Sequence, residues 1–185
     1  MDTTFKHASE SQVVISELML PSHSNFSGKI HGGYILSLMD QVAFACAAKY
    51  SGQYCVTASV NTVDFINPIE IGELVTLKAS VNWVGNSSMV VGIRVESEDI
   101  TTGEKKHCNS SYFTMVSKDE NGKNVAVPGL VLRTDDDIRR FSKSIRRKEM
   151  QSTRRKEFTD TNFASKAYID QLKNYKVKVE YQPAS

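Results

Sequence analysis

The sequence lacks the features that would point to a membrane, to secretion or to a repetitive structure. No apolar run is long enough to span a bilayer, and the N-terminal segment MDTTFKHASESQVV has no apolar stretch after a basic start, as a secretory signal would. Four prolines and ten glycines in 185 residues give no low-complexity pattern. Because 40% of the residues are apolar, we expect one globular domain with a substantial core and room for an appendage.

Cysteine is scarce and is not spaced as a metal site requires. Cys46, Cys55 and Cys108 are odd in number and lack ligand spacing, so we expect no bound metal. Cys46 lies in an apolar segment and Cys55 begins another, which favours small buried hydrophobic side chains over disulfide partners. This usage is typical of the reducing cytoplasm.

Common catalytic signatures are missing as well. The sequence contains no G-x-S-x-G motif, no Walker loop and no Rossmann glycine fingerprint. Any chemistry must therefore come from residues outside these motifs.

What the chain does have is an uneven charge distribution. Residues 1–132 carry 9 Lys+Arg against 13 Asp+Glu, a net of −4, whereas residues 133–178 carry 14 against 7, a net of +7. We therefore predict an acidic globular domain over 1–132 and a basic helical extension over 133–185.

The apolar pattern predicts an α+β fold. Residues 11–20 indicate a strand that ends at Pro21, and residues 31–50 indicate a helix that is apolar on nearly every side. Long, roughly alternating runs rich in Val and Thr then predict four strands with short turns, and hence antiparallel neighbours in a meander-like sheet, over 54–66, 73–84, 87–99 and 105–118. A helix apolar all round is accommodated if a curved sheet wraps it.

The basic extension begins with a predicted helix over 135–158. Thr134 is a possible N-cap, and acids in the first turn precede bases, in the order that a helix dipole prefers. Ile138, Phe141 and Ile145 form one narrow apolar stripe. Residues 175–181 favour a strand or an ordered arm.

Asp40 stands out because it interrupts the apolar helix. A carboxylate among apolar side chains must be neutral, paired or facing a wet cleft. The structural alternative is a helix face that meets solvent, with Ser37 and Gln41 as its polar neighbours. Residue types alone leave both interpretations open.

The segment before this helix holds further candidates. Asn25 is an ordinary turn residue by composition. Gly32 and Gly33 place unpaired N–H groups at a helix start, where they can hold an oxyanion or simply allow a tight turn. His31 can serve as a base or, more commonly, as a helix cap.

Taken together, these residues resemble a known family. The motifs GG…MD, T-x-S-x-x-x-V-x-F, P-I-x-x-G and G-N-S-S-M occur in order between Ser11 and Pro128. They are similar to those of hotdog-fold acyl-CoA thioesterases, in the cytosolic acyl-CoA hydrolase branch that includes the YciA-type and brain-type enzymes. The resemblance implies a long helix wrapped by an antiparallel sheet, and homodimers often assembled as trimers of dimers.

The resemblance also implies a site. Asn25 and Asp40 match a catalytic pair that comes from opposite subunits, so Asp40 is expected to be buried in its own chain and to face a cleft made with a second copy. Asp40 would act as general base or as nucleophile on a thioester. Oxyanion or substrate contacts are expected from Gly32, Gly33, Thr57, Ser59, Phe65, Ser87 and Ser88. No cofactor is implied, because coenzyme A is part of the substrate.

The basic extension has three interpretations. The first is a helix whose charges simply face solvent. The second is binding of CoA phosphates through Arg146 and Arg147, and the third is binding of nucleic acid. The last is least favoured, because interleaved aromatic residues and a known module are missing. We therefore expect neither nucleic acid nor membrane as a partner.

Two other functions compete with acyl-CoA hydrolysis. One is a non-catalytic module that binds or senses acyl-CoA, which would not need both Asn25 and Asp40. The other is a dehydratase of the same fold that uses His31, which would want an acidic partner for that histidine in the cleft.

Overall fold

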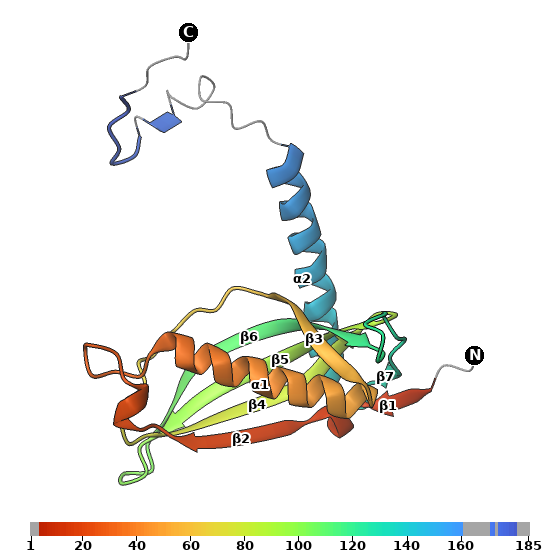
Figure 1. The fold of residues 1–185 in the computed structure, drawn as a ribbon, viewed down its shortest axis with the longest axis horizontal. Helices are drawn as coiled ribbons and strands as arrows, with labels where there is room; N and C mark the ends of the chain where they lie inside the picture. The colour runs from red at the N-terminus through yellow and green to blue at the C-terminus, as the bar shows by residue number, and fades with distance from the viewer. Residues whose placement is uncertain (1–3, 161–170, 173, 181–185) are drawn as a thin grey trace. The chain divides into compact units, whose positions relative to one another are not determined.

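The computed structural model describes residues 4–160, 171–172 and 174–180 (Figure 1). Its elements in chain order are β1 (Phe5–His7), η1 (Ala8–Ser11), β2 (Val13–Leu18), η2 (Pro21–His23), α1 (Gly32–Ser51), β3 (Tyr54–Val60), β4 (Leu74–Val84), β5 (Ser88–Glu98), β6 (Lys105–Lys118), β7 (Gly129–Val131) and α2 (Asp135–Asp160). The chain divides into two compact units, Met1–Ile145 and Arg146–Ser185. The functional division at residue 132 stays a prediction.

One antiparallel sheet of five strands dominates the first unit, as predicted. Its order is β2-β4-β5-β6-β3, and every neighbouring pair is antiparallel. The predicted meander is right for β4, β5 and β6 but wrong for β3, which pairs with β6 at the far edge. The chain between Val60 and Leu74 is long enough to pass β6 and β5 before β4 begins, so β3 and β4 need not be neighbours.

The strand predicted over 54–66 is also shorter than expected. β3 ends at Val60, and the next residues follow the edge of β6 without a regular ladder. The N–H groups of Asn61 and Ile66 donate to the carbonyls of Tyr112 and Cys108, at 3.0 and 2.9 Å. The segment is thus held against β6 by separate hydrogen bonds, which a periodicity of two does not reveal.

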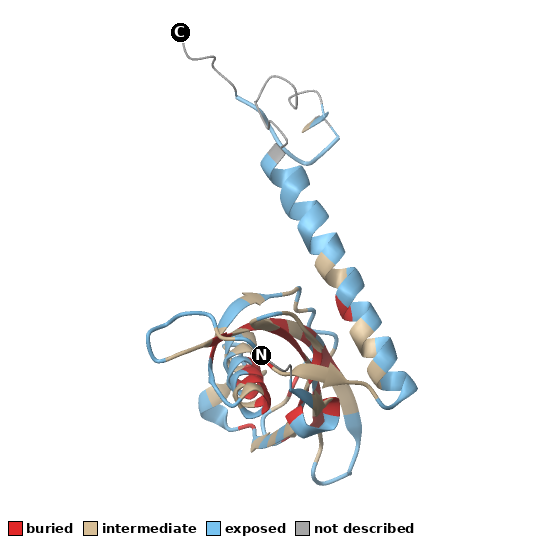
Figure 2. Ribbon diagram, turned by 90° about the vertical axis from the view of Figure 1, so that its right-hand side faces the viewer, coloured by how far each residue is buried: buried red, intermediate tan, exposed pale blue. Residues whose placement is uncertain are grey.

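The predicted helix wrapped by a curved sheet is confirmed, but only one face of α1 is covered. In Figure 2, α1 is seen nearly end-on, with its buried residues toward the sheet. Its buried side chains are Ile35, Leu38, Met39, Val42, Ala43, Cys46, Ala47 and Tyr50. The helix ends at Gly52, whose φ of 71° is the left-handed conformation that glycine adopts without a steric penalty.

The opposite face of α1 is open in the single chain. Ser37, Asp40, Gln41 and Phe44 are exposed and follow one another at helical spacing. The prediction that Asp40 is buried in its own chain is therefore wrong. The sheet covers one side of the helix, and Asp40 lies outside the covered side, within reach of the edge strand β3.

The basic extension begins as predicted. Thr134 and Asp137 cap α2 reciprocally, because each backbone N–H donates to the other's side chain at 3.1 Å. Of the predicted stripe, Phe141 is half-buried, whereas Ile138 and Ile145 remain exposed. No strand forms over residues 174–180, and residue 181 lies outside the described part of the chain.

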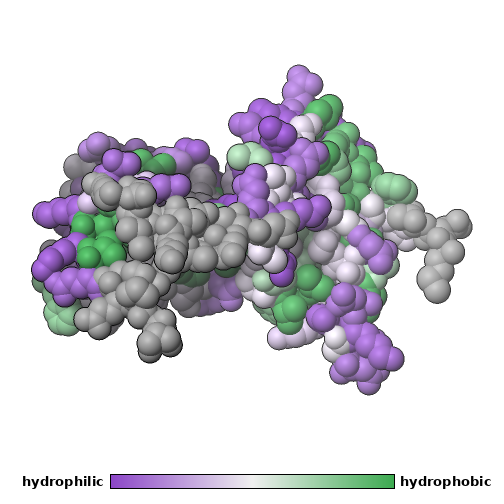
Figure 3. All heavy atoms as spheres, turned by 90° about the horizontal axis from the view of Figure 1, so that it is seen from above, coloured by the Kyte–Doolittle hydropathy of each residue, from purple (hydrophilic) through white to green (hydrophobic). Residues whose placement is uncertain are grey.

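The surface carries both kinds of side chain. Figure 3 shows hydrophobic side chains among hydrophilic ones on the face seen from above. Within the described residues, no helix combines the length and the hydrophobicity that a membrane crossing requires.

Candidate active site

Asp40 is held in place by a residue from the neighbouring edge strand. The hydroxyl of Thr57, on β3, donates to Asp40 Oδ1 at 2.6 Å. The same hydroxyl lies 3.5 Å from Met115 Sδ, but sulfur is the weaker acceptor, so the carboxylate takes the proton. This contact fixes the carboxylate's orientation, and in the described part of the chain no hydrogen-bond partner is found for Oδ2, on the open face of α1.

Asn25 is oriented by its own loop. Its Oδ1 accepts hydrogen bonds from Ser27 N, Ser27 Oγ and Lys29 N, at 2.9, 2.7 and 3.2 Å. Two of these groups are backbone N–H groups, which can only donate, so the oxygen end of the amide must face them. The Nδ2 end, with its two N–H donors, therefore points away from the loop's hydrogen-bond network.

The start of α1 distinguishes the two predicted glycines. Gly33 N donates to His31 Nδ1 at 2.9 Å, so His31 is the N-cap and this N–H is already used. Among the described residues, no partner is found for the N–H of Gly32. A Cβ built on Gly32 would lie 3.2 Å from Phe65 Cζ, so the Phe65 ring stands directly against the helix start. The structure thus brings Gly32 and Phe65 together.

The other predicted contacts lie elsewhere. Ser59 follows Thr57 on β3 and is half-buried. Ser87 lies in the turn before β5 and Ser88 is the first residue of that strand; their carbonyls accept from Ser117 N and Gly85 N. That turn is at the opposite end of β4 from the helix start, so one chain does not bring the two serines to Gly32. In the second unit, Arg146 pairs with Glu149 at 3.4 Å.

A single chain also keeps Asp40 away from the loop that carries Asn25. Asp40 lies eight positions after Gly32 on α1, which is roughly 12 Å along the helix axis. The donors at the helix start and the Asp40 carboxylate cannot act on one bond at that separation.

Sequence reasoning missed the contacts that hold the Asn25 loop. The His23 ring stacks on Tyr34, with 4.0 Å between centroids, and the Tyr34 hydroxyl donates to Glu17. That hydrogen bond raises the pKa of Tyr34, and its burial adds to the shift. On the other side of the loop, Lys29 forms an ion pair with Glu70. The partners are 17 and 41 residues apart in sequence, so no local pattern signals them.

The described residues indicate neither a metal site nor a reactive thiol at Cys46. Within the described residues, no group of three or more His, Cys, Asp or Glu side chains is placed to hold a metal ion. Burial raises the pKa of the Cys46 thiol to about 12, so it remains protonated and unreactive at neutral pH.

Comparisons with known proteins bear on what this site does. A family model described as the thioesterase superfamily matches residues 27–104. Protein VdlD of Helicobacter pylori is 44% identical over 151 residues, which cover 82% of this chain and 86% of VdlD. YkhA of Bacillus subtilis, named an uncharacterized acyl-CoA thioester hydrolase, is 35% identical over 147 residues, covering 80% of this chain and 86% of YkhA.

Solved structures are similar over nearly the same range. An apo-hexameric acyl-CoA thioesterase has a TM-score of 0.80 at 33% identity, and the match covers 82% of this chain and 97% of that one. The acyl-CoA hydrolase of Staphylococcus aureus, in complex with butyryl coenzyme A and coenzyme A, has a TM-score of 0.77 at 30% identity and covers 91% of this chain and 99% of that one. Other structures of that enzyme carry alanine in place of one asparagine, one aspartate or one threonine.

Proposed function

The chain belongs to the thioesterase superfamily and has a hotdog fold, and from that premise we propose that it hydrolyses acyl-CoA to free CoA and a carboxylic acid. The observation that carries this proposal is the Asp40 carboxylate, held by Thr57 on an otherwise open helix face. An oriented, solvent-facing carboxylate is what activation of water requires. The three residue types replaced in the Staphylococcus aureus hydrolase are also those of Asn25, Asp40 and Thr57.

The proposed chemistry uses the high reactivity of the thioester carbonyl. A thioester carbonyl is more electrophilic than that of an ester, because sulfur donates poorly into it. Asp40 takes a proton from water while the water oxygen bonds to the carbonyl carbon. The C–S bond then breaks, and protonated Asp40 returns the proton to the leaving thiolate. In the alternative route, Asp40 attacks the carbonyl carbon directly, the C–S bond breaks and CoA leaves as the thiolate. Water then hydrolyses the resulting mixed anhydride, which releases the carboxylic acid and restores Asp40.

Asn25 is proposed to act as a hydrogen-bond donor. Its Oδ1 already accepts three hydrogen bonds from its own loop, so only Nδ2 is available to a ligand. We assign Nδ2 to the thioester carbonyl oxygen, where negative charge develops, together with the N–H of Gly32. Phe65 would cover this end of the substrate, and Thr57 would orient Asp40.

The site requires two chains in this proposal. Because Gly32 and Asp40 of one chain are about 12 Å apart along α1, Asp40 would work with the Asn25 and Gly32 of a second copy. The hexameric state of the similar thioesterase supports an assembly of this kind, and we propose a homo-oligomer built on a dimer, such as a trimer of dimers. Ser59, Ser87 and Ser88 remain predicted substrate contacts in that assembly.

The remaining assignments follow from the substrate. Acyl-CoA is the substrate and CoA is a product, so no separate cofactor is needed. Arg146 and Arg147 are the predicted contacts for the CoA phosphates. We expect the protein to act in the cytoplasm, without nucleic acid or membrane as a partner.

The competing functions are less well supported. A pure binding module has no use for a hydrogen-bonded carboxylate on an open helix face. A dehydratase would need His31 as a base, but His31 Nδ1 already caps the helix.

Release of free thiol from a panel of acyl-CoA substrates tests the proposal. We expect catalytic turnover by the unmodified protein. Stoichiometric binding of acyl-CoA without thiol release would instead favour the binding module, and hydration of an unsaturated acyl-CoA would favour the dehydratase.

A further inference from the structure

Lys29 links the Asn25 loop to the rest of the domain. Its backbone N–H donates to Asn25 Oδ1 at 3.2 Å, and its carbonyl accepts the Asn25 N–H at 2.7 Å. Its side chain reaches out of the loop and pairs with Glu70, with 2.5 Å between Nζ and Oε1. The same residue therefore contacts both the amide assigned to the substrate and a fixed point outside the loop.

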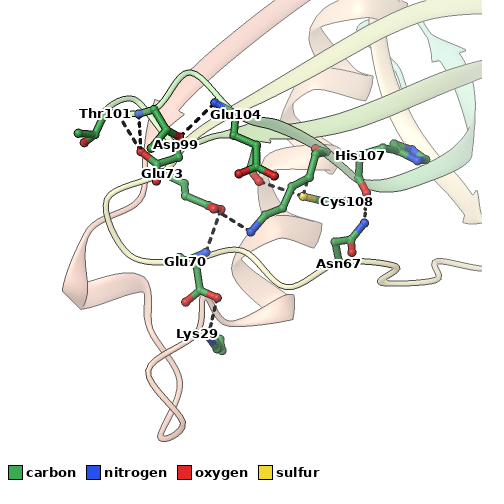
Figure 4. A network of polar contacts seen from close by, with 12 residues as sticks. Lys29, Asn67, Glu70, Glu73, Asp99, Thr101, Glu104, His107 and Cys108 are labelled. Carbon is green, nitrogen blue, oxygen red and sulfur yellow. Dashed lines mark hydrogen bonds and ion pairs between the residues drawn. The ribbon is translucent and has the colours of Figure 1, made fainter.

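Glu70 is itself held by a nearly buried carboxylate. The backbone N–H of Glu70 donates to Glu73 Oε2 at 3.0 Å, and Glu73 Oε1 pairs with Lys106 Nζ, on β6, at 2.7 Å. Although partial burial acts to raise it, the hydrogen bonds from Lys106, Glu70 and Ser97 hold the pKa of Glu73 below its usual range. In Figure 4, Lys29, Glu70 and Glu73 follow one another as one chain of polar contacts.

Stability does not account for the outer ion pair. The side chains of Lys29 and Glu70 are 45% and 40% exposed, and ion pairs this exposed contribute little to folding. A role in positioning the Asn25 loop fits the ion pair better, because small displacements of a group that contacts the reacting atoms have large effects on rate.

We propose that the Lys29–Glu70 ion pair, supported by Glu73 and Lys106, fixes the loop that presents the Asn25 amide. These are positioning residues, since they act through Asn25 and touch no substrate atom in this assignment. The inference rests on the proposed hydrolysis of acyl-CoA. It adds a network outside the site that sets the rate of that hydrolysis.

The first test is Lys29→Met, with Lys105→Met as its matched control. Lys105 pairs with Glu98 at 3.1 Å and is also exposed, but it lies outside the Asn25 loop. With butyryl-CoA as the probe, we expect Lys29→Met to lower kcat about tenfold, within the effect of a modest misplacement. KM and the melting temperature should stay near those of the unmodified protein, and Lys105→Met should leave kcat unchanged.

Rescue by an ion pair separates positioning from other roles. Lys29→Glu and Glu70→Lys should each lower kcat, and the double variant should restore most of it, since the pair is re-formed in reverse. Lys29→Arg should retain kcat, because it keeps the contact with Glu70. Thermal melting of every variant shows whether a rate loss merely reflects unfolding.

Three outcomes would overturn the inference. The first is an unchanged kcat in Lys29→Met. The second is an increase in KM alone in that variant, which would make Lys29 a substrate contact. The third is a loss of kcat in both Lys29→Arg and the double variant. Failure of the proposed function looks different. In that case the unmodified protein releases no thiol, or Asp40→Asn leaves thiol release unchanged.

Discussion

The two faces of α1 share one helix but differ in what they contact. Met39, Val42 and Cys46 are fully buried against the sheet, whereas Asp40, Gln41 and Phe44 are exposed in the single chain. The buried face stabilises the domain through apolar contacts, and the open face carries the carboxylate that we assign to catalysis. Neighbours in the sequence can therefore have separate roles, and substitutions can test that separation.

Met39→Ala should have the largest effect on folding. Met39 is fully buried, and replacing such a residue by alanine leaves a cavity that costs about 2–5 kcal/mol of unfolding free energy. Thiol release per folded molecule should remain close to normal. Chemical denaturation together with the rate below the melting transition measures both quantities, and a large loss of kcat in folded protein would mean that the two faces are not separate.

Asp40→Asn, at the next position, should lower activity and leave stability unchanged. Loss of a general base or nucleophile should lower kcat by roughly 100-fold or more, with little change in KM. The melting temperature should hold, because Asp40 is exposed and makes no ion pair in the described part of the chain. Full activity with reduced stability would overturn the catalytic assignment, and Gln41→Leu serves as a control on the same face.

Thr57→Val tests the orientation of the carboxylate. Valine has nearly the same shape but cannot donate to Asp40 Oδ1, so kcat should fall about tenfold, as expected for loss of a hydrogen bond to a charged group. Thr57→Ser keeps the hydroxyl and should retain most of the activity. Equal rates for the two variants would show that the hydroxyl does not matter.

Replacement of Arg146 and Arg147 by Gln tests the basic extension. If these residues contact CoA phosphates, KM for acyl-CoA should rise roughly three- to tenfold while kcat stays constant, since two charge-assisted contacts are lost. An unchanged KM at low ionic strength, where such contacts are strongest, would assign the extension another role.

The outer surface of the sheet supplies the smallest expected effect. Lys78 and Arg94 lower the pKa of Glu96 to about 2. Stability from this depressed pKa is present above the ordinary glutamate pKa and is lost as the pH falls from about 4.5 toward 2. Glu96→Gln should therefore cost about 1 kcal/mol at neutral pH, because the two basic partners are half exposed, and the cost should vanish near pH 2. Denaturation across this pH range measures it, and turnover should be unaffected.

The sequence predicted the fold more completely than the site. The apolar helix, the long strands β4 to β6 and the capped basic helix were all recognisable, because each depends on residues close together in the chain. The position of β3 was missed, since a 13-residue connection to β4 allows β3 to pair with β4 or with a more distant strand such as β6. For the site, the residue types at Asn25, Asp40 and the helix start drew attention through the family resemblance, while their roles stay proposals.

By itself, the sequence determined which segments form helices and strands, and that Asp40 is a charged residue in an otherwise apolar helix. It could do so because periodicity and composition are local properties. Only the tertiary structure decided that Asp40 lies on an open face, that Thr57 holds it and that the Asn25 amide turns its nitrogen outward. It also decided that Lys29 meets Glu70, 41 residues away. Such contacts depend on how distant segments pack, and the packing that fixes them is a property of the whole domain rather than of any one stretch of the chain.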